Sequence, residues 1–193
     1  MRINTRRISI ILALLLTAIL VPVVLIWNTR PASETAQFGT SLREELRSAT
    51  AQEALDIANR LRKDEPSIHT TLTAEHVEFV FPDGRNVGVP VDTSEMIVSV
   101  APYRLRTHPC AIHSISGCQG DITDRPFEVA VYDRDGELVV NRTITTGDNG
   151  FFEIALPRDS EFLVSVESNL GRAERLVGTH ADDPTCITDM QLL

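Results

Sequence analysis

Apolar and polar residues alternate along most of the chain after residue 76, and this period of two predicts a series of β-strands. The alternating segments are VEFVF (77–81), VGVPV (87–91), MIVSVAPY (96–103), FEVAVYD (127–133), ELVVNRTITT (137–146), FFEIALP (151–157), FLVSVES (162–168) and a last short strand within CITDMQL (186–192). Turn sequences such as PDGRN (82–86), DRDG (133–136) and GDNG (147–150) separate several of them. Short strands between turns are typical of a small antiparallel sandwich or barrel.

A helical period precedes the strands. Apolar residues recur at helical spacing at Leu42, Leu46, Ala54, Leu55, Ala58 and Leu61. Ser41 and Glu44 have the spacing of a capping box, in which each residue caps the other. Thr50 and Glu53 repeat that spacing. We therefore expect one kinked helix or two short ones, ending before Pro66, and an α+β fold for the chain.

The first residues carry a membrane signal. Residues 8–27 (ISIILALLLTAILVPVVLIW) contain no charge, and about 20 such residues in a helix span the roughly 30 Å of a bilayer. Arginines precede this run at positions 2, 6 and 7, which favours an exported remainder. The run is longer than a signal-peptide core and no A-x-A-like site follows it. We expect an uncleaved anchor; cleavage would instead release a secreted protein.

These patterns divide the chain into five parts. We expect a basic cytoplasmic flank (1–7), a transmembrane anchor or signal sequence (8–27), a linker (28–40), a small α/β subdomain (41–103) and a β-rich domain (104–193). The last of these contains all three cysteines.

Composition and charge exclude some classes of function. Hydrophobic residues make up 42% of the 193 residues, which is enough for a core, and the formal net charge is −9. An acidic chain is a poor partner for nucleic acid, because phosphate binding needs clustered basic residues. Motifs of nucleotide-binding loops, serine hydrolases and zinc proteases are absent. We therefore expect a binding protein rather than an enzyme.

Three cysteines in an exported chain are an odd number, so at least one sulfur lacks a disulfide partner within the chain. Cys110 and Cys118 lie in one segment with His108 and His113, and Cys186 lies far along the chain. A Cys110–Cys118 disulfide with a buried Cys186 is one interpretation, and a redox-active pair is a second. A metal site is the third: three thiolates suit trigonal Cu(I), whereas zinc would recruit a histidine as a fourth ligand.

The motifs together resemble the CueP family of exported copper-binding proteins. The matching residues are SVAPY (99–103), Thr107, His108, Cys110, His113, Ser114, Cys118, Gly120, Thr145, Thr146, NGF (149–151), LPR (156–158), TCIT (185–188) and MQL (190–192). The resemblance covers about residues 41–192. The chain departs from the family pattern at Ala111, Ile112, Ala155 and Asp189, none of which is a sulfur ligand.

The resemblance implies copper, as Cu(I), held outside the cytoplasmic membrane by the sulfurs of Cys110, Cys118 and Cys186, with His113 and His108 in an auxiliary position. The implied role is copper sequestration, buffering or delivery in the bacterial cell envelope. The implied partners are the copper ion, the membrane and a protein that accepts or exports copper. Two alternatives stay open: thiol-dependent reduction of Cu(II), and a disulfide-stabilised interaction domain without metal.

Overall fold

The computed structural model describes the backbone of residues 32–193 and the side chains from residue 36 onward. The chain divides into two compact units, residues 1–44 and 45–193. The described part of the first unit belongs to helix α2 (Ala32–Ser48), and the second unit begins with the end of that helix. The expected anchor, residues 8–27, lies outside the described residues. Within the described residues, no helix is long and apolar enough to cross a membrane.

Helix α3 (Ala51–Asp64) begins where the sequence places a cap. The Thr50 side chain accepts a hydrogen bond from the Glu53 backbone, and the Glu53 carboxylate accepts one from the Thr50 backbone at 2.8 Å. This capping box is the predicted one, and the helix ends before Pro66 as predicted. The capping box predicted at Ser41 is wrong, because α2 already begins at Ala32 and Ser41 lies inside it. The linker expected over residues 28–40 is likewise helical from Ala32.

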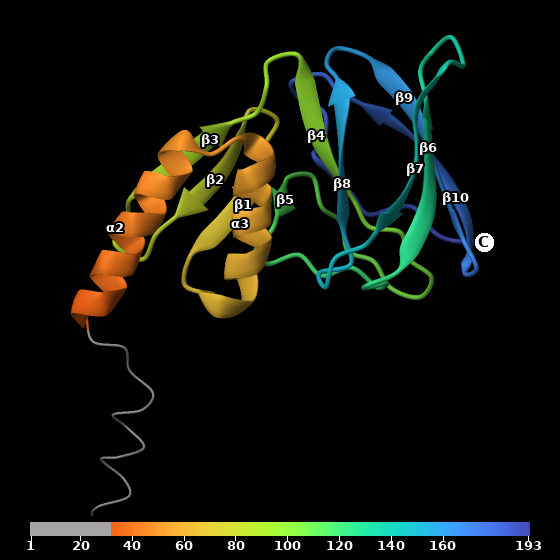
Figure 1. The fold of residues 1–193 in the computed structure, drawn as a ribbon. Coiled ribbons are helices and arrows are strands. Elements are labelled where there is room, and N and C mark those ends of the chain that lie inside the picture. The colour runs from red at the N-terminus through yellow and green to blue at the C-terminus, as the bar shows by residue number, and fades with distance from the viewer. Residues whose placement is uncertain (1–31) are drawn as a thin grey trace, which may run out of the picture. The chain divides into compact units, whose positions relative to one another are not determined.

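A first sheet lies beside α3 and has the strand order β3-β2-β1-β5 (Figure 1). Its strands are β1 (His69–Leu72), β2 (His76–Val80), β3 (Asn86–Pro90) and β5 (His113–Ser114). Helix α3 packs against β2 and β3. The β2–β3 hairpin is predicted by its alternation and turn, whereas β1 and the two-residue β5 have no such signal. Through β5, the cysteine-containing loop joins this first sheet.

The remaining strands form two sheets that enclose the main core. One has the order β10-β9-β6-β7 and the other β11-β4-β8. Their bounds are β4 (Glu95–Val100), β6 (Pro126–Tyr132), β7 (Leu138–Thr145), β8 (Phe152–Pro157), β9 (Glu161–Ser168), β10 (Gly171–Gly178) and β11 (Cys186–Ile187). Inward side chains from both sheets, such as Val98, Phe127 and Val164, are buried in one cluster. The β-rich, sandwich-like part of the α+β prediction is confirmed.

Two features of this sandwich differ from the expectation. Strand β11 runs parallel to β4, pairing Cys186 with Ser99, whereas the sequence predicts an antiparallel sandwich. Parallel pairing requires a long connection between the two strands. Here the connection contains the cysteine-containing loop and strands β6 to β10. Strand β4 pairs with β8 and β11 from the later part of the chain, and β5 pairs with β1 from the earlier part. The sheets therefore do not separate at residue 103, and the domain boundaries stay a prediction.

Candidate metal centre

The structure brings four of the five predicted site residues together. Candidate ligand atoms of Cys110, His113, Cys118 and Cys186 all lie within 4.8 Å of one another. All three cysteines are free thiols. The fifth residue, His108, lies outside this group of four but lines a neighbouring pocket. Residues far apart in the sequence thus form one thiol and imidazole cluster.

The sulfur atoms come from two structural elements. Cys110 and Cys118 belong to the loop between β4 and β6, and their Sγ atoms are 3.5 Å apart. Cys186 comes from β11, where backbone bonds from Ser99 N to Thr185 O and from Ala101 N to Ile187 O fix the strand beside β4. Its side chain is 2% exposed, whereas the two loop thiols are half-buried. The rigid strand therefore supplies the inner sulfur and the loop supplies the two outer ones.

The loop is held to the terminal segment by two threonines. The Thr107 hydroxyl donates to the Thr188 carbonyl, and the Thr188 hydroxyl donates to the His108 carbonyl at 2.6 Å. A short turn also orients the second loop thiol, because Cys118 N donates to Ser114 O at 2.8 Å. These bonds place the loop sulfurs beside Cys186 without any bond between the sulfurs.

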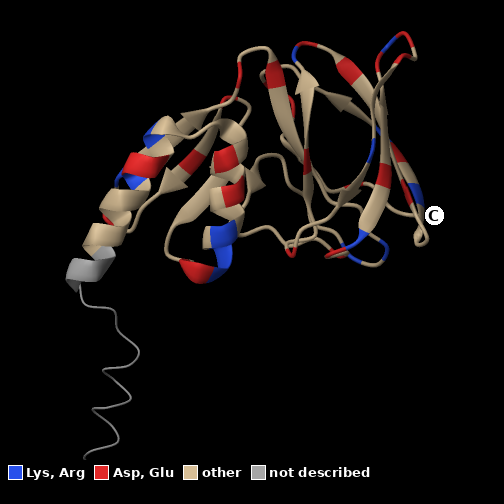
Figure 2. Ribbon diagram, viewed as in Figure 1, with Lys and Arg blue, Asp and Glu red and all other residues tan. Residues whose placement is uncertain are grey.

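The loop is also held by a turn from another part of the chain. Gly120 N donates to Asn149 O at 2.6 Å, and the buried Asn149 side chain bonds the backbone of Phe151 and the side chain of Asn59. The last turn of α3 is basic (Figure 2), and its Arg62 reaches Gln119, the residue after Cys118. The sequence assigned no role to Asn59, Arg62 or Gln119. Gly120 and NGF (149–151) were noted only as part of the family resemblance and, for Gly120, as a flexible position in the loop.

The three thiols differ in acidity because they interact with one another. Hydrogen bonding from Cys186, opposed by burial and supported by His113 and His108, lowers the pKa of Cys118. The hydrogen bond that Cys186 gives to Cys118, together with burial, raises the pKa of Cys186. Burial is also the main cause that raises the pKa of Cys110. Cys118 is therefore the first of the three to become the thiolate, which is the form that binds metals.

The imidazole of His113 is fixed from several directions. It is fully buried, and its ring centroid lies 4.3 Å from that of Phe151. Its backbone N donates to Thr185 Oγ1 at 3.2 Å, and its Nδ1 lies 3.6 Å from Cys186 Sγ. Its Nε2 is buried and has no hydrogen-bond partner among the described residues. The ring therefore presents Nδ1 to the sulfurs.

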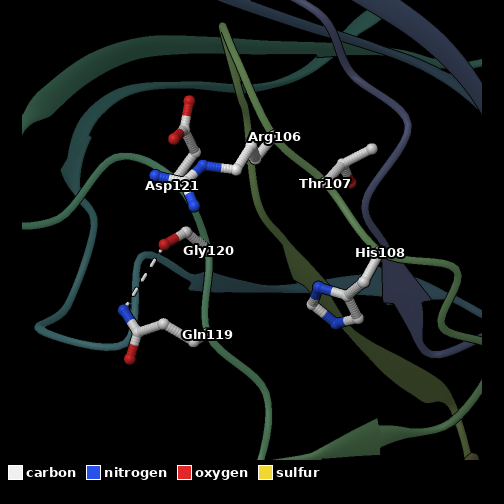
Figure 3. Close-up of a pocket in the computed structure, with 6 residues that line it drawn as sticks. All are labelled: Arg106, Thr107, His108, Gln119, Gly120 and Asp121. Carbon is white, nitrogen blue, oxygen red and sulfur yellow. Dashed lines mark hydrogen bonds between the residues drawn. The ribbon is translucent and has the colours of Figure 1, made fainter.

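A pocket of about 350 Å³ opens beside the cluster. It is lined by residues on both sides of the cysteine segment, as Figure 3 shows: Arg106, Thr107, His108, Gln119, Gly120 and Asp121. His108 lines this pocket and is also one of the groups that lower the pKa of Cys118, so the pocket adjoins the thiol cluster.

Asp121 is the residue of this pocket with the most direct effect on the loop. Its Oδ2 accepts the backbone N–H groups of Leu105 at 2.9 Å and Arg104 at 3.0 Å. These bonds lower the pKa of Asp121. We predict that Asp121→Ala lowers the free energy of unfolding by about 1 kcal/mol at neutral pH, a value discounted for solvent screening.

The pH dependence of this effect follows from the direction of the shift. A carboxyl whose pKa is lowered in the folded state stabilises the fold above its unfolded pKa, near 4. That stability is lost as the pH falls toward the lower folded value. Urea unfolding of both forms at neutral pH and near pH 2 should show the difference only at neutral pH. The exposed Asp182→Ala serves as the control; an equal loss there would contradict this role for Asp121.

A β-rich fold that gathers three free thiols and an imidazole defines a protein suited to soft metal ions. The family model for CueP, described as a periplasmic copper-binding protein, matches residues 52–191. The chain therefore belongs to the CueP family. It is also similar to the crystal structure of S.CueP, at 29% sequence identity and a TM-score of 0.71, over 86% of this chain and 100% of that one. The comparison with curated proteins found no match.

Proposed function

We propose that this chain is an extracytoplasmic copper-binding protein that holds one Cu(I) through the thiolates of Cys110, Cys118 and Cys186. The observation that carries this proposal is the convergence of these three free sulfurs from a loop and a distant strand. Membership of a family described as periplasmic copper-binding supports copper as the metal. The function is sequestration, buffering or delivery of copper.

The chemistry of the donor atoms supports Cu(I) over harder ions. Thiolate sulfur is a soft ligand, and it selects Cu(I) and zinc over magnesium or calcium. The lowered pKa of Cys118 provides a first thiolate, and bound metal drives loss of the remaining thiol protons. Three thiolates on Cu(I) have a net charge of about −2, which is costly to bury. The half-buried position of the two loop sulfurs reduces that cost.

The histidines have auxiliary roles toward Cu(I) in this proposal. His113 packs against Phe151, and its Nδ1 lies within hydrogen-bonding reach of Cys186 Sγ at 3.6 Å. His108 lines the neighbouring pocket and helps to lower the pKa of Cys118, so we assign it a supporting role beside the sulfurs. Because two ligands come from the loop and one from β11, bound copper would hold the terminal segment to the loop.

The location follows from the same proposal. The family description supports the cell envelope. We propose that residues 8–27 tether the protein to the cytoplasmic membrane, with the described residues on its outer side. We also retain residue 103 as the boundary between the small subdomain and the copper-binding domain. A copper-accepting or copper-exporting protein is the proposed protein partner.

An anaerobic Cu(I) titration of the reduced full-length chain against a competing chelator tests the proposal. We expect one tightly bound copper per reduced chain, and three reactive thiols in the native protein when it is freed of copper without added reductant. A chain that fails to compete for Cu(I), or that exposes a single thiol because the other two form a permanent disulfide, would contradict the proposal. Either result would favour the disulfide-stabilised interaction domain.

A further inference from the structure

The cluster contains four candidate ligand atoms rather than three, and their separations are compatible with the corners of a tetrahedron. Two separate pairs are already close: the Sγ atoms of Cys110 and Cys118 at 3.5 Å, and Cys186 Sγ with His113 Nδ1 at 3.6 Å. These two pairs share no atom, so they correspond to two opposite edges of a tetrahedron of ligand atoms. With zinc bonds of about 2.3 Å to sulfur and about 2.0 Å to nitrogen, tetrahedral edges measure roughly 3.8 Å for two sulfurs and roughly 3.5 Å for sulfur and nitrogen.

The remaining pairs need only a small adjustment. No two of the four atoms are more than 4.8 Å apart, so the longest edge must shorten by roughly 1 Å to reach the tetrahedral value. Cys110 and Cys118 lie on a half-buried loop, where their side chains can rotate to close this gap. The two inner ligands, on β11 and β5, are held by strand pairing and need not move.

The state of His113 independently points to a fourth ligand. Its side chain is fully buried, its Nε2 has no hydrogen-bond partner among the described residues, and its Nδ1 lies 3.6 Å from Cys186 Sγ, a contact with a candidate metal ligand. A buried imidazole so poorly satisfied is costly unless it has another function. Metal bonding at Nδ1 would leave the proton on Nε2.

The charge of the site also favours a divalent ion. Three thiolates with a monovalent ion have a net charge of about −2, and with a divalent ion about −1. Cys186 and His113 are almost inaccessible to water, so the smaller charge costs less to bury. Neutral imidazole as the fourth ligand adds no charge.

We infer that this cluster also binds one divalent ion of the zinc class in a tetrahedral site made by Cys110, Cys118, Cys186 and His113 Nδ1. The inference uses the thiols of the proposed copper centre but does not require that copper binds. It makes His113 the residue that distinguishes the two metals. Cu(I) is complete with three sulfurs, whereas zinc needs the imidazole.

Cobalt(II) is the probe of choice, because its visible absorption distinguishes tetrahedral thiolate sites from six-coordinate ones. We expect the reduced full-length chain to bind one Co(II) with intense tetrahedral bands and thiolate charge transfer, and zinc to displace it. His113→Asn should weaken zinc binding by more than about 100-fold and alter the cobalt bands, while changing Cu(I) affinity by less, because the loss of a direct ligand exceeds the cost of losing an outer-shell residue. His113→Cys, which restores a ligand, should recover a tetrahedral spectrum.

The matched control is His108→Asn, which changes the neighbouring histidine outside the four-atom cluster and should keep the tetrahedral cobalt spectrum. Only weak six-coordinate bands in the unmodified protein would overturn the inference. So would unchanged zinc affinity in His113→Asn, or an equal loss of zinc and Cu(I) binding in it. Zinc binding without Cu(I) binding would contradict the proposed copper function and leave this inference standing.

Discussion

Replacing Cys186 with serine should weaken Cu(I) binding by more than about 100-fold, because the loss of a direct ligand exceeds the 10–100-fold cost of losing an outer-shell residue. The serine hydroxyl is a hard donor that stays protonated at neutral pH, so it does not replace a thiolate. Serine has nearly the same size, and β11 is held to β4 by its backbone. The fold should therefore survive, and the lost affinity can be read as a lost ligand.

The measurement is competition for Cu(I) under anaerobic conditions, with circular dichroism as a check on folding. The control is Ile187→Val, which alters the next residue on β11, also 2% exposed, without removing a sulfur. That change should cost about 1 kcal/mol of stability and leave copper affinity unchanged. If Cys186→Ser binds Cu(I) within about threefold of the unmodified protein, the site does not use three sulfurs.

The second large effect is expected at Gly120, where the loop crosses the turn at Gly150. A Cβ added at Gly120 would lie 2.7 Å from Gly150 O and 3.1 Å from Gly150 Cα. These are backbone atoms, so the crossing itself must open. We expect Gly120→Ala to cost about 2–3 kcal/mol, in the range of an overpacked site, and to weaken metal binding because Cys118 shifts.

Gly136→Ala is the control for Gly120→Ala, because it introduces backbone strain without steric crowding. Gly136 has φ 79°, and nothing lies within 4 Å of a Cβ added there. That variant should cost only the left-handed strain of about 1–2 kcal/mol and should not change metal affinity. Urea unfolding and metal titration of both variants test the comparison. Equal metal affinity in Gly120→Ala and the unmodified protein would show that this crossing does not position the thiol.

Features encoded by neighbouring residues could be predicted from the sequence. The capping box at Thr50 and Glu53 involves residues three positions apart, and the β2–β3 hairpin is set by its turn and alternation. The start of α2 was missed because its residues from Ala32 to Gly39 have no clear apolar stripe. Strand β5 was missed because two residues have no period, and it exists only by pairing with β1.

The sequence predicted which sulfur atoms belong to the candidate site, but it did not predict how they are arranged. Cys110, Cys118 and Cys186 carry the family resemblance, so the sequence identified them together. The two histidines of the motif look equivalent in sequence. His113 reaches the cluster because β5 pairs with β1, and that contact depends on residues more than 40 positions away. The arrangement of the loop likewise depends on Asn149, whose bonds no local pattern predicts.

The position of Cys186 on β11 also sets an order of events during biogenesis. A chain that is made and exported from its N-terminus presents Cys110 and Cys118 before the strand carrying Cys186 has left the ribosome. Until β11 docks beside β4, Cys118 lacks the hydrogen bond that most lowers its pKa. In the proposed location, the two early sulfurs would therefore enter the oxidising compartment as ordinary, less reactive thiols. In the proposed copper site, the last strand to arrive supplies the third sulfur and also makes Cys118 more acidic.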